Sequence, residues 1–263
     1  CIMNGIALHG GIFFSFFTFF AFSDYMKPAY RMSALMRLPV KYIWSHDAFR
    51  VGEDGPTHQP IEQEAQVRLM EHVKNHKGKN SMLVLRPADV HETTVAWKMA
   101  MENLDTPTGL ILSRQNINDL PWENGNNYEQ ALGAEKGAYI VKDCKGTPDI
   151  IMVASGSEVS TLFEGAKLLE ERKNLNIRIV SAPSEGLFRS QSKEYQTEVL
   201  PNNIPTYGMT AGLSLNIRDL VGANGFIHGL NHFGYSAPYK VLDEKFGFNG
   251  ESVYNEVCEY LNI

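Results

Sequence analysis

The sequence predicts an α/β protein: an incomplete, doubly wound and mostly parallel sheet, followed by a second, three-layer α/β domain. Short apolar runs alternate with segments whose apolar residues recur at helical spacing, which is typical of βαβ construction. Between the two halves, at Pro121–Glu135, the composition turns polar and loses its apolar period. We therefore predict a first domain at residues 1–120, a linker at 121–137 and a second domain at 138–263.

Three apolar runs form the predicted sheet of the first domain, and two helical patterns connect them. The predicted strands are Pro39–Ser45, Ser81–Arg86 and Gly109–Ser113. The predicted helices are Ile61–Lys74 and Glu92–Asn103. Doubly wound sheets usually contain about five or six strands. We therefore expect sequence to be missing before Cys1, where the chain starts without Met.

The second domain repeats the alternation of strands and helices. Its predicted strands are Ala138–Val141, Asp149–Ala154, Ile177–Ser181, Thr206–Met209 and Phe226–His228. Its predicted helices are Ser157–Arg172, Ala211–Val221, Tyr239–Phe246 and Glu251–Leu261. We expect its conspicuous polar residues, such as His228 and His232, to serve the structure.

The aromatic run IFFSFFTFFAF at Ile12–Phe22 is too short to span a bilayer, which takes about 20 apolar residues. It has no basic segment before it and no small-residue cleavage site after it, so a signal peptide is disfavoured. We predict a buried aromatic segment and no contact with a membrane.

The composition excludes other classes of protein. The net charge is −6 and no basic run occurs, which argues against general nucleic-acid binding. Cys1, Cys144 and Cys258 form neither a CxxC pair nor a zinc-ligand pattern. We therefore expect a reducing, cytoplasmic setting and no structural zinc.

The densest polar cluster of the sequence is HDAFRVGEDGPTHQP at residues 46–60, between a predicted strand and a predicted helix. In parallel α/β sheets, ligands bind in the crevice beyond the carboxyl ends of the strands. Glycines and prolines brace this loop, and its imidazoles and carboxylates suit acid–base chemistry or hydroxyl recognition. Two alternatives are a solvated loop with capping histidines and a metal site of His46, Asp54 and His58, although their spacing matches no familiar ligand pattern.

This loop resembles the signature sequence of the transketolases, with GEDGPTHQP as its core. Further matches follow in family order: MNGIALHGG near the start, RPAD at 86–89, LSRQN at 112–116, ASGSEV at 154–159, FGYSAP at 233–238 and FGF at 246–248. The resemblance covers the whole chain. It implies the thiamine-diphosphate-binding fold, with the end of a pyrimidine-binding domain followed by a transketolase C-terminal domain.

The resemblance implies transfer of two-carbon ketol units from ketose phosphates to aldose phosphates. His46 then contacts the substrate phosphate, and Asp54 binds the hydroxyl at C2 of the sugar. His58 is a second substrate histidine, to which we also assign a catalytic role. Arg114 pairs with the phosphate, for which a guanidinium is well suited. Arg50 is expected to add positive charge near the path of the phosphate.

The resemblance also implies thiamine diphosphate and Mg²⁺ as cofactors of the intact enzyme. Phe22 corresponds to the aromatic residue that stacks on the aminopyrimidine ring, with Phe19 and Tyr25 nearby. The glutamate that contacts the pyrimidine and the N-terminal domain that binds Mg²⁺ and the diphosphate do not occur in this sequence. We therefore expect no metal ligands here and neither cofactor binding nor turnover by the chain alone. The parent enzyme is expected to be a homodimer.

Two other functions stay open. The chain can be one subunit of a split transketolase, with the missing half as its partner. It can also be a non-catalytic module that binds sugar phosphates through His46, His58 and Arg114.

Overall fold

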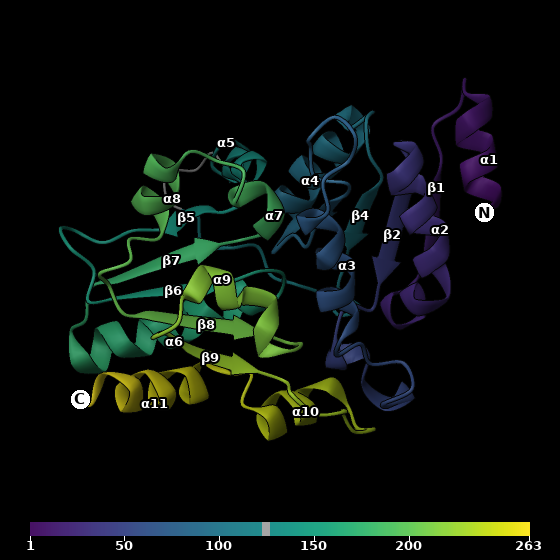
Figure 1. Cartoon of the computed structure of the whole chain (residues 1–263). Coiled ribbons are helices and arrows are strands. Elements are labelled where there is room, and N and C mark those ends of the chain that lie inside the picture. Colours follow the sequence, from purple (N-terminus) through teal and green to yellow (C-terminus); the bar gives the residue numbers. More distant parts are fainter. Residues whose placement is uncertain (123–126) are drawn as a thin grey trace.

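The computed structural model describes residues 1–122 and 127–263, which form two sheets side by side (Figure 1). The first sheet has the order β1-β2-β4-β3, and all its pairings are parallel. Its strands are β1 (Ser15–Phe19), β2 (Lys41–Ser45), β3 (Leu83–Leu85) and β4 (Thr108–Ile111). The three predicted strands are thus confirmed, whereas β1 was not predicted.

Helices cover both faces of the first sheet, as the doubly wound prediction requires. They are α1 (Ile2–His9), α2 (Ser23–Met36), α3 (Gln63–His72) and α4 (Val90–Glu102). Tyr30 of α2 and Val67 of α3 pack on one face, in a cluster with Trp44 of β2. Ala96 and Ala100 of α4 pack on the other face. The helices predicted at α3 and α4 are confirmed, and α4 is capped by Asp89, whose side chain accepts a hydrogen bond from the amide of Glu92.

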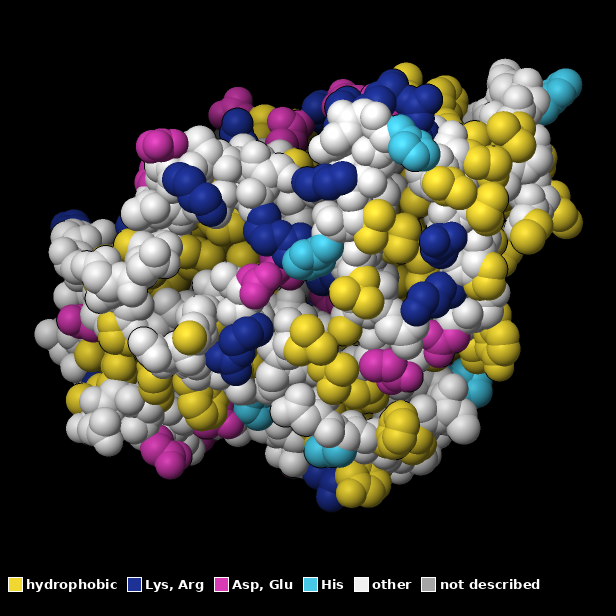
Figure 2. Space-filling model, viewed as in Figure 1, with side chains coloured by type: hydrophobic (Ala, Val, Ile, Leu, Met, Phe, Trp, Pro, Cys, Tyr) yellow, Lys and Arg dark blue, Asp and Glu magenta, His cyan; other side chains and the backbone are white. Residues whose placement is uncertain are grey.

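The prediction that Ile12–Phe22 is buried is wrong for most of the run. Its centre forms β1, the edge strand of the first sheet, and Phe13 and Phe17 are 58% and 61% exposed. Phe20 alone among its phenylalanines is fully buried, beside Trp44. Because β1 is an edge strand, it has a neighbouring strand on one side only, and most of its side chains stay exposed. Hydrophobic side chains accordingly gather on the surface near α1 and α2 (Figure 2). None of the described helices has the length and apolar character needed to cross a membrane.

The second sheet has the order β5-β7-β6-β8-β9. Its strands are β5 (Tyr139–Lys142), β6 (Ile150–Ala154), β7 (Ile177–Ser181), β8 (Thr206–Thr210) and β9 (Phe226–Gly229). The edge strand β5 runs antiparallel to β7, and the other pairings are parallel. All five strands predicted for this half are confirmed.

Two layers of helices enclose the second sheet. The helices on one face are α6 (Glu158–Lys173) and α11 (Gly250–Leu261), and α10 (Tyr239–Phe246) joins the same apolar cluster. Those on the other face are α7 (Glu185–Phe188), α8 (Lys193–Val199) and α9 (Arg218–Val221). The three-layer prediction is confirmed. The helix predicted at Ala211–Val221 starts later, with the 3-10 helix η4 (Ser214–Ile217) before α9.

The predicted linker contains helical turns. After residues 123–126, which lie outside the described part of the chain, come α5 (Asn127–Ala131) and the 3-10 helix η3 (Leu132–Lys136). Both pack against α4, and Ala131 and Ala134 are buried. The polar composition concealed this packing, since the fully buried residues of the two turns are small alanines.

Residues of the first half, among them Ala48 and Phe49, join the apolar core of the second sheet. The 3-10 helices η1 (Phe20–Phe22) and η2 (Phe49–Asp54) follow β1 and β2, and η2 packs against α10. The fully buried ring of Phe49 lies 5.1 Å from the ring of Phe246 and 4.8 Å from that of Phe248. The loop after β2 is therefore held between the two halves of the molecule.

Candidate functional site

The candidate site is the loop at residues 46–60, which begins where β2 ends. His46 has a φ of 60°, a left-handed backbone conformation that non-glycine residues seldom adopt. Its Nδ1 lies 2.8 Å from the hydroxyl of Ser45. Its ring stacks on Phe19, with centroids 3.6 Å apart and planes 13° apart. The register explains the contact, because Phe19 of β1 pairs with Ser45 of β2.

The aromatic residues predicted to bind the cofactor lie beside both histidines. Phe22 is 5.4 Å from the ring of His58, in an edge-to-face arrangement, and Phe19 is 6.2 Å from it. Tyr25 lies 6.2 Å from Phe22, at the margin of the group, and is 85% exposed. The structure therefore brings His46, His58, Phe19 and Phe22 together.

The predicted charged residues, Asp54 and Arg114, lie close enough to His46 to affect its protonation. Burial lowers the pKa of His46, and the positive charge of Arg114 lowers it further, whereas Asp54 and Asp47 act in the opposite direction. Arg114 comes soon after β4, which pairs with β2. Both Asp54 and Arg114 are exposed, and no hydrogen bond or ion pair engages either side chain within residues 1–122 and 127–263. We call His46, Asp54, His58 and Arg114 the loop face.

Bonds to the second half of the chain brace this loop. Ser236 donates a hydrogen bond to the carbonyl oxygen of Glu53 at 2.5 Å. The side-chain nitrogen of Gln59 donates to the carbonyl oxygens of Gly52, at 3.1 Å, and Tyr235, at 3.0 Å. Gly52 has a φ of 85°, which a residue with a Cβ would adopt only with strain. Hydrogen bonds with the FGYSAP segment therefore hold the GEDGPTHQP loop in place.

The expectation that Arg50 adds charge near the phosphate path is wrong. Arg50 is only 6% exposed, and its Nε donates to Asp243 at 2.6 Å. Its Nη1 donates to Ser157 and Glu158 at 2.8 and 3.2 Å. The neighbours Phe49 and Val51 are buried, and a buried arginine needs partners for its charge.

Metal coordination by His46, Asp54 and His58, the alternative considered above, does not fit the geometry. The clusters of metal-ligating side chains found in the described residues are His72, Glu185 and Asp219, and Asp89, His91 and Asp119. Neither belongs to the loop. The carboxylate of Asp89 already accepts hydrogen bonds from the amides of Glu92 and Leu120 and from the indole of Trp122.

The site fits one part of thiamine diphosphate. Phe19 and Phe22 are partly buried, and Tyr25 is exposed beside them, which suits a planar aromatic ring such as an aminopyrimidine. The diphosphate and its Mg²⁺ need oxygen ligands arranged around the ion. The described loop residues form no such cluster of side chains.

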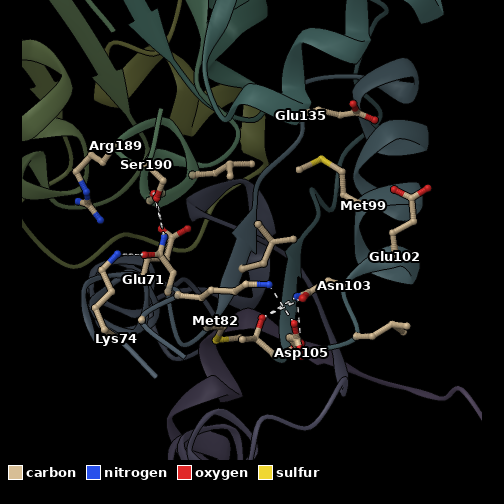
Figure 3. A pocket seen from close by; sticks show the side chains of 18 of the residues that line it. Glu71, Lys74, Met82, Met99, Glu102, Asn103, Asp105, Glu135, Arg189 and Ser190 are labelled. Carbon is tan, nitrogen blue, oxygen red and sulfur yellow. Dashed lines mark hydrogen bonds and ion pairs between the residues drawn. The ribbon is translucent and has the colours of Figure 1, made fainter. Parts of the chain in front are cut away.

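A separate groove of about 1060 Å³ lies near the amino ends of β3 and β4, between the two halves (Figure 3). Several of its charged side chains are already paired. Lys79 contacts Asp105 at 3.1 Å, and Lys98 contacts Glu135 at 2.7 Å. Arg189 contacts Glu185 at 2.6 Å. The loop face, in contrast, offers charges without such partners.

Comparison with known proteins gives two family models that together span most of the chain. The model described as "Transketolase, pyrimidine binding domain" matches residues 1–119. The model described as "Transketolase-like TK C-terminal domain" matches residues 137–249.

Whole-chain relatives agree with these models. The chain is 43% identical to a transketolase of Bacillus subtilis over 99% of its own length, and it spans 37% of that relative. A crystal structure of a Pichia stipitis transketolase in complex with sedoheptulose-7-phosphate is 36% identical, with a TM-score of 0.83; the match covers 99% of this chain and 36% of that one. A structure titled "Split gene transketolase, inactive beta4 tetramer" shares the fold at 22% identity and a TM-score of 0.73. That match covers 99% of this chain and 80% of the split-gene chain.

Proposed function

Because this chain belongs to the transketolase family, we propose that it forms the sugar-phosphate-binding part of an enzyme that transfers two-carbon ketol units from ketose phosphates to aldose phosphates. The observation that carries the proposal is the loop face: two imidazoles, a carboxylate and a guanidinium beside a partly exposed aromatic pair. The Pichia stipitis transketolase was solved in complex with sedoheptulose-7-phosphate, a phosphorylated ketose, which is the class of ligand proposed here.

In this proposal Arg114 binds the phosphate with charge-assisted hydrogen bonds. His46 supports it as a neutral donor, because burial lowers its pKa. The hydroxyl of Ser45 is hydrogen-bonded to Nδ1 of His46, and the hydroxyl of Thr57 is hydrogen-bonded to Nδ1 of His58. The Nε2 atom of each ring is therefore the one available to the substrate. Asp54 accepts a hydrogen bond from a sugar hydroxyl, and His58 moves a proton at the substrate.

Thiamine diphosphate, when bound, supplies the carbon nucleophile that carries the two-carbon unit between sugars. Phe22, with Phe19 and Tyr25, would hold the aminopyrimidine ring. We propose that the diphosphate and Mg²⁺ are held by another part of the enzyme, so that the chain alone binds the cofactor negligibly and does not turn over. A homodimeric parent, a cytoplasmic location and domains at 1–120 and 138–263 belong to the same proposal.

Calorimetric titration tests the proposal without requiring turnover. We expect the chain to bind a phosphorylated ketose more tightly than the same sugar without its phosphate. Equal affinity for the two sugars would contradict a phosphate site. Titration with thiamine diphosphate and Mg²⁺ tests the second claim, which micromolar binding would refute.

A second candidate is one subunit of a split transketolase. The split-gene structure favours it, because the match spans 80% of a chain that is itself only part of an enzyme. Mixing this chain with an N-terminal transketolase half should then restore ketol transfer. Phosphate-dependent sugar binding with no restored activity and no cofactor requirement would instead indicate a non-catalytic sugar-phosphate module.

A further inference from the structure

The loop at residues 46–60 has an inner side that faces the second half of the chain. Asp47, directly after His46, is 6% exposed and accepts a hydrogen bond from Nη2 of Arg86 at 2.7 Å. Arg86 follows β3 and is 1% exposed. Its Nη1 donates to the carbonyl oxygen of Ser155 at 2.7 Å and also contacts Glu158. The arginine of RPAD thus reaches from the first sheet into ASGSEV.

Gly156 makes room for this arginine. A Cβ at this position would lie 2.6 Å from Cζ of Arg86, closer than side-chain atoms can pack. The φ of Gly156 is 63°, which also favours glycine. The turn before α6 is therefore shaped around a guanidinium from the other half of the chain.

Glu158 forms ion pairs with both buried arginines, Arg50 and Arg86. It is the first residue of α6, it is 0% exposed, and it contacts Arg50 at 3.2 Å as well as Arg86. Arg50 also binds Asp243 of α10 at 2.6 Å. We call Asp47, Arg50, Arg86, Glu158 and Asp243 the interface cluster. It connects two points of the loop, Asp47 and Arg50, to the second half.

The loop's own bonds are short in range. The amides of Val51, Gly55 and His58 each donate to the carbonyl oxygen three residues earlier, at 3.0–3.1 Å. Such turns fix local shape, but they do not fix where a loop points relative to a sheet. A left-handed His46 also needs surroundings that hold it, because this conformation costs free energy.

We propose that the second half of the chain positions the loop face, with Glu158 and Asp243 as positioning residues that act through Arg50 and Arg86. Neither carboxylate belongs to the loop face; each fixes a guanidinium that holds the loop. The importance of this positioning for ligand binding rests on the proposed function, whereas the positioning itself is independent of any ligand.

Hydrogen exchange of the whole chain tests the proposal without substrate. In Glu158→Gln and in Asp243→Asn, we expect amides of residues 46–60 to exchange at least about ten times faster than in the unaltered protein. Amides of β2 and β4 should keep their protection. The control is Val199→Ala at the end of α8, since Val199 is 2% exposed and belongs to a different core cluster. It destabilises the second half but should leave the loop's exchange unchanged.

A spectroscopic readout complements exchange. The ring of His46 lies 3.6 Å from that of Phe19, so the Phe19 ring current displaces the His46 proton resonances upfield. We expect Asp243→Asn to move these resonances toward those of an unstacked histidine, and Val199→Ala to leave them in place. If Glu158→Gln does not fold, Asp243→Asn and Ser236→Ala still provide the test.

Unaltered exchange and resonances in both Asp243→Asn and Ser236→Ala would overturn the proposal. Equal loosening of the loop in Val199→Ala would also overturn it, because the effect would then be general destabilisation. Failure of the unaltered chain to bind a sugar phosphate would contradict the proposed function while leaving these results intact.

Discussion

His46 and Asp47 are neighbours in the chain, yet they belong to two different regions. His46 is part of the loop face, where Asp54 and Arg114 are exposed and have no charged partner in the described part of the chain. Asp47 is part of the interface cluster, where every charged group is buried or half-buried and paired. Both regions use arginines and carboxylates. The comparison teaches that pairing and burial, rather than residue type, separate a charge that supports the fold from one that is available to a ligand.

The physical reason is the cost of desolvation. A buried charge that loses its partner is left uncompensated in a medium of low polarity, whereas an exposed charge is solvated by water. Substitutions in the interface cluster should therefore lower the free energy of unfolding. Substitutions on the loop face should lower affinity for the ligand and leave stability nearly unchanged.

The largest effect is expected at Glu158. Glu158→Gln leaves two buried guanidinium groups facing an uncharged amide, and we expect a loss of about 3–5 kcal/mol in the free energy of unfolding. Urea unfolding of the whole chain measures it. Arg172→Ala at the exposed Arg172–Glu251 pair is the control and should not move the transition measurably. A loss at Glu158 as small as the control's would break the comparison.

Among the described residues, Glu92 is a buried carboxyl group without a cationic partner, and it shows what burial does when pairing is absent. Glu92 is 0% exposed, and its partners are the amide of Ala88 and the hydroxyl of Tyr139, both neutral. Burial raises its pKa from 4.5 to about 7. The folded chain therefore binds more protons than the unfolded chain between these values, so the stabilisation is present below pH 4.5 and is lost as pH rises through 7.

A shift of this size corresponds to about 3 kcal/mol. Glu92→Gln should flatten the decline in stability between pH 5 and 7.5, measured by urea unfolding at each pH. Part of the decline should persist, since burial also raises the pKa of Glu185 to about 7. An unchanged pH profile would show that Glu92 is ionised in the fold, and burial alone would then not decide its state.

The loop face is tested at Arg114. Arg114→Ala should weaken binding of a phosphorylated sugar about tenfold or more, because a charge-assisted hydrogen bond is lost. Stability should change by less than about 0.5 kcal/mol, as for other exposed residues. Calorimetric titration and urea unfolding provide the two readouts. Arg114→Lys should restore part of the affinity, since it keeps the charge without the bidentate geometry. A loss of stability without a loss of affinity would place Arg114 with the interface cluster.

The smallest effect is expected in the groove. Lys79 is 64% exposed along its side chain and is paired with Asp105. Lys79→Ala should change neither the thermal unfolding transition nor the affinity for a phosphorylated sugar by more than the error of measurement. A clear loss of sugar-phosphate affinity would move the candidate site from the loop to the groove.

The sequence predicted the repeating elements better than the unusual ones. Strands such as Ile177–Ser181 and helices such as Tyr239–Phe246 were found because apolar spacing reflects burial on one or both faces. Strand β1 was missed, since a continuous aromatic run has no alternation to distinguish an exposed edge from a core. Helix α2, with Pro28 inside it, was not predicted either.

The location of the candidate site could also be predicted from a local pattern in the sequence. The loop follows a strand and is dense in polar residues, so its location could be inferred from the chain alone. The inward direction of Arg50 could not, because its partners Ser157 and Asp243 lie 107 and 193 residues away in the sequence. Contacts over such distances leave no local periodicity.

The packing of Phe49 against the second half has a practical consequence for cutting the chain into two fragments. The sequence suggests a cut somewhere in residues 121–137, but the ring of Phe49 lies against Phe246 and Phe248, on the far side of that boundary. The boundary along the chain is thus not the boundary in space. Two fragments separated by protease at that segment should stay associated, and either fragment made by itself would present a bare aromatic surface to water.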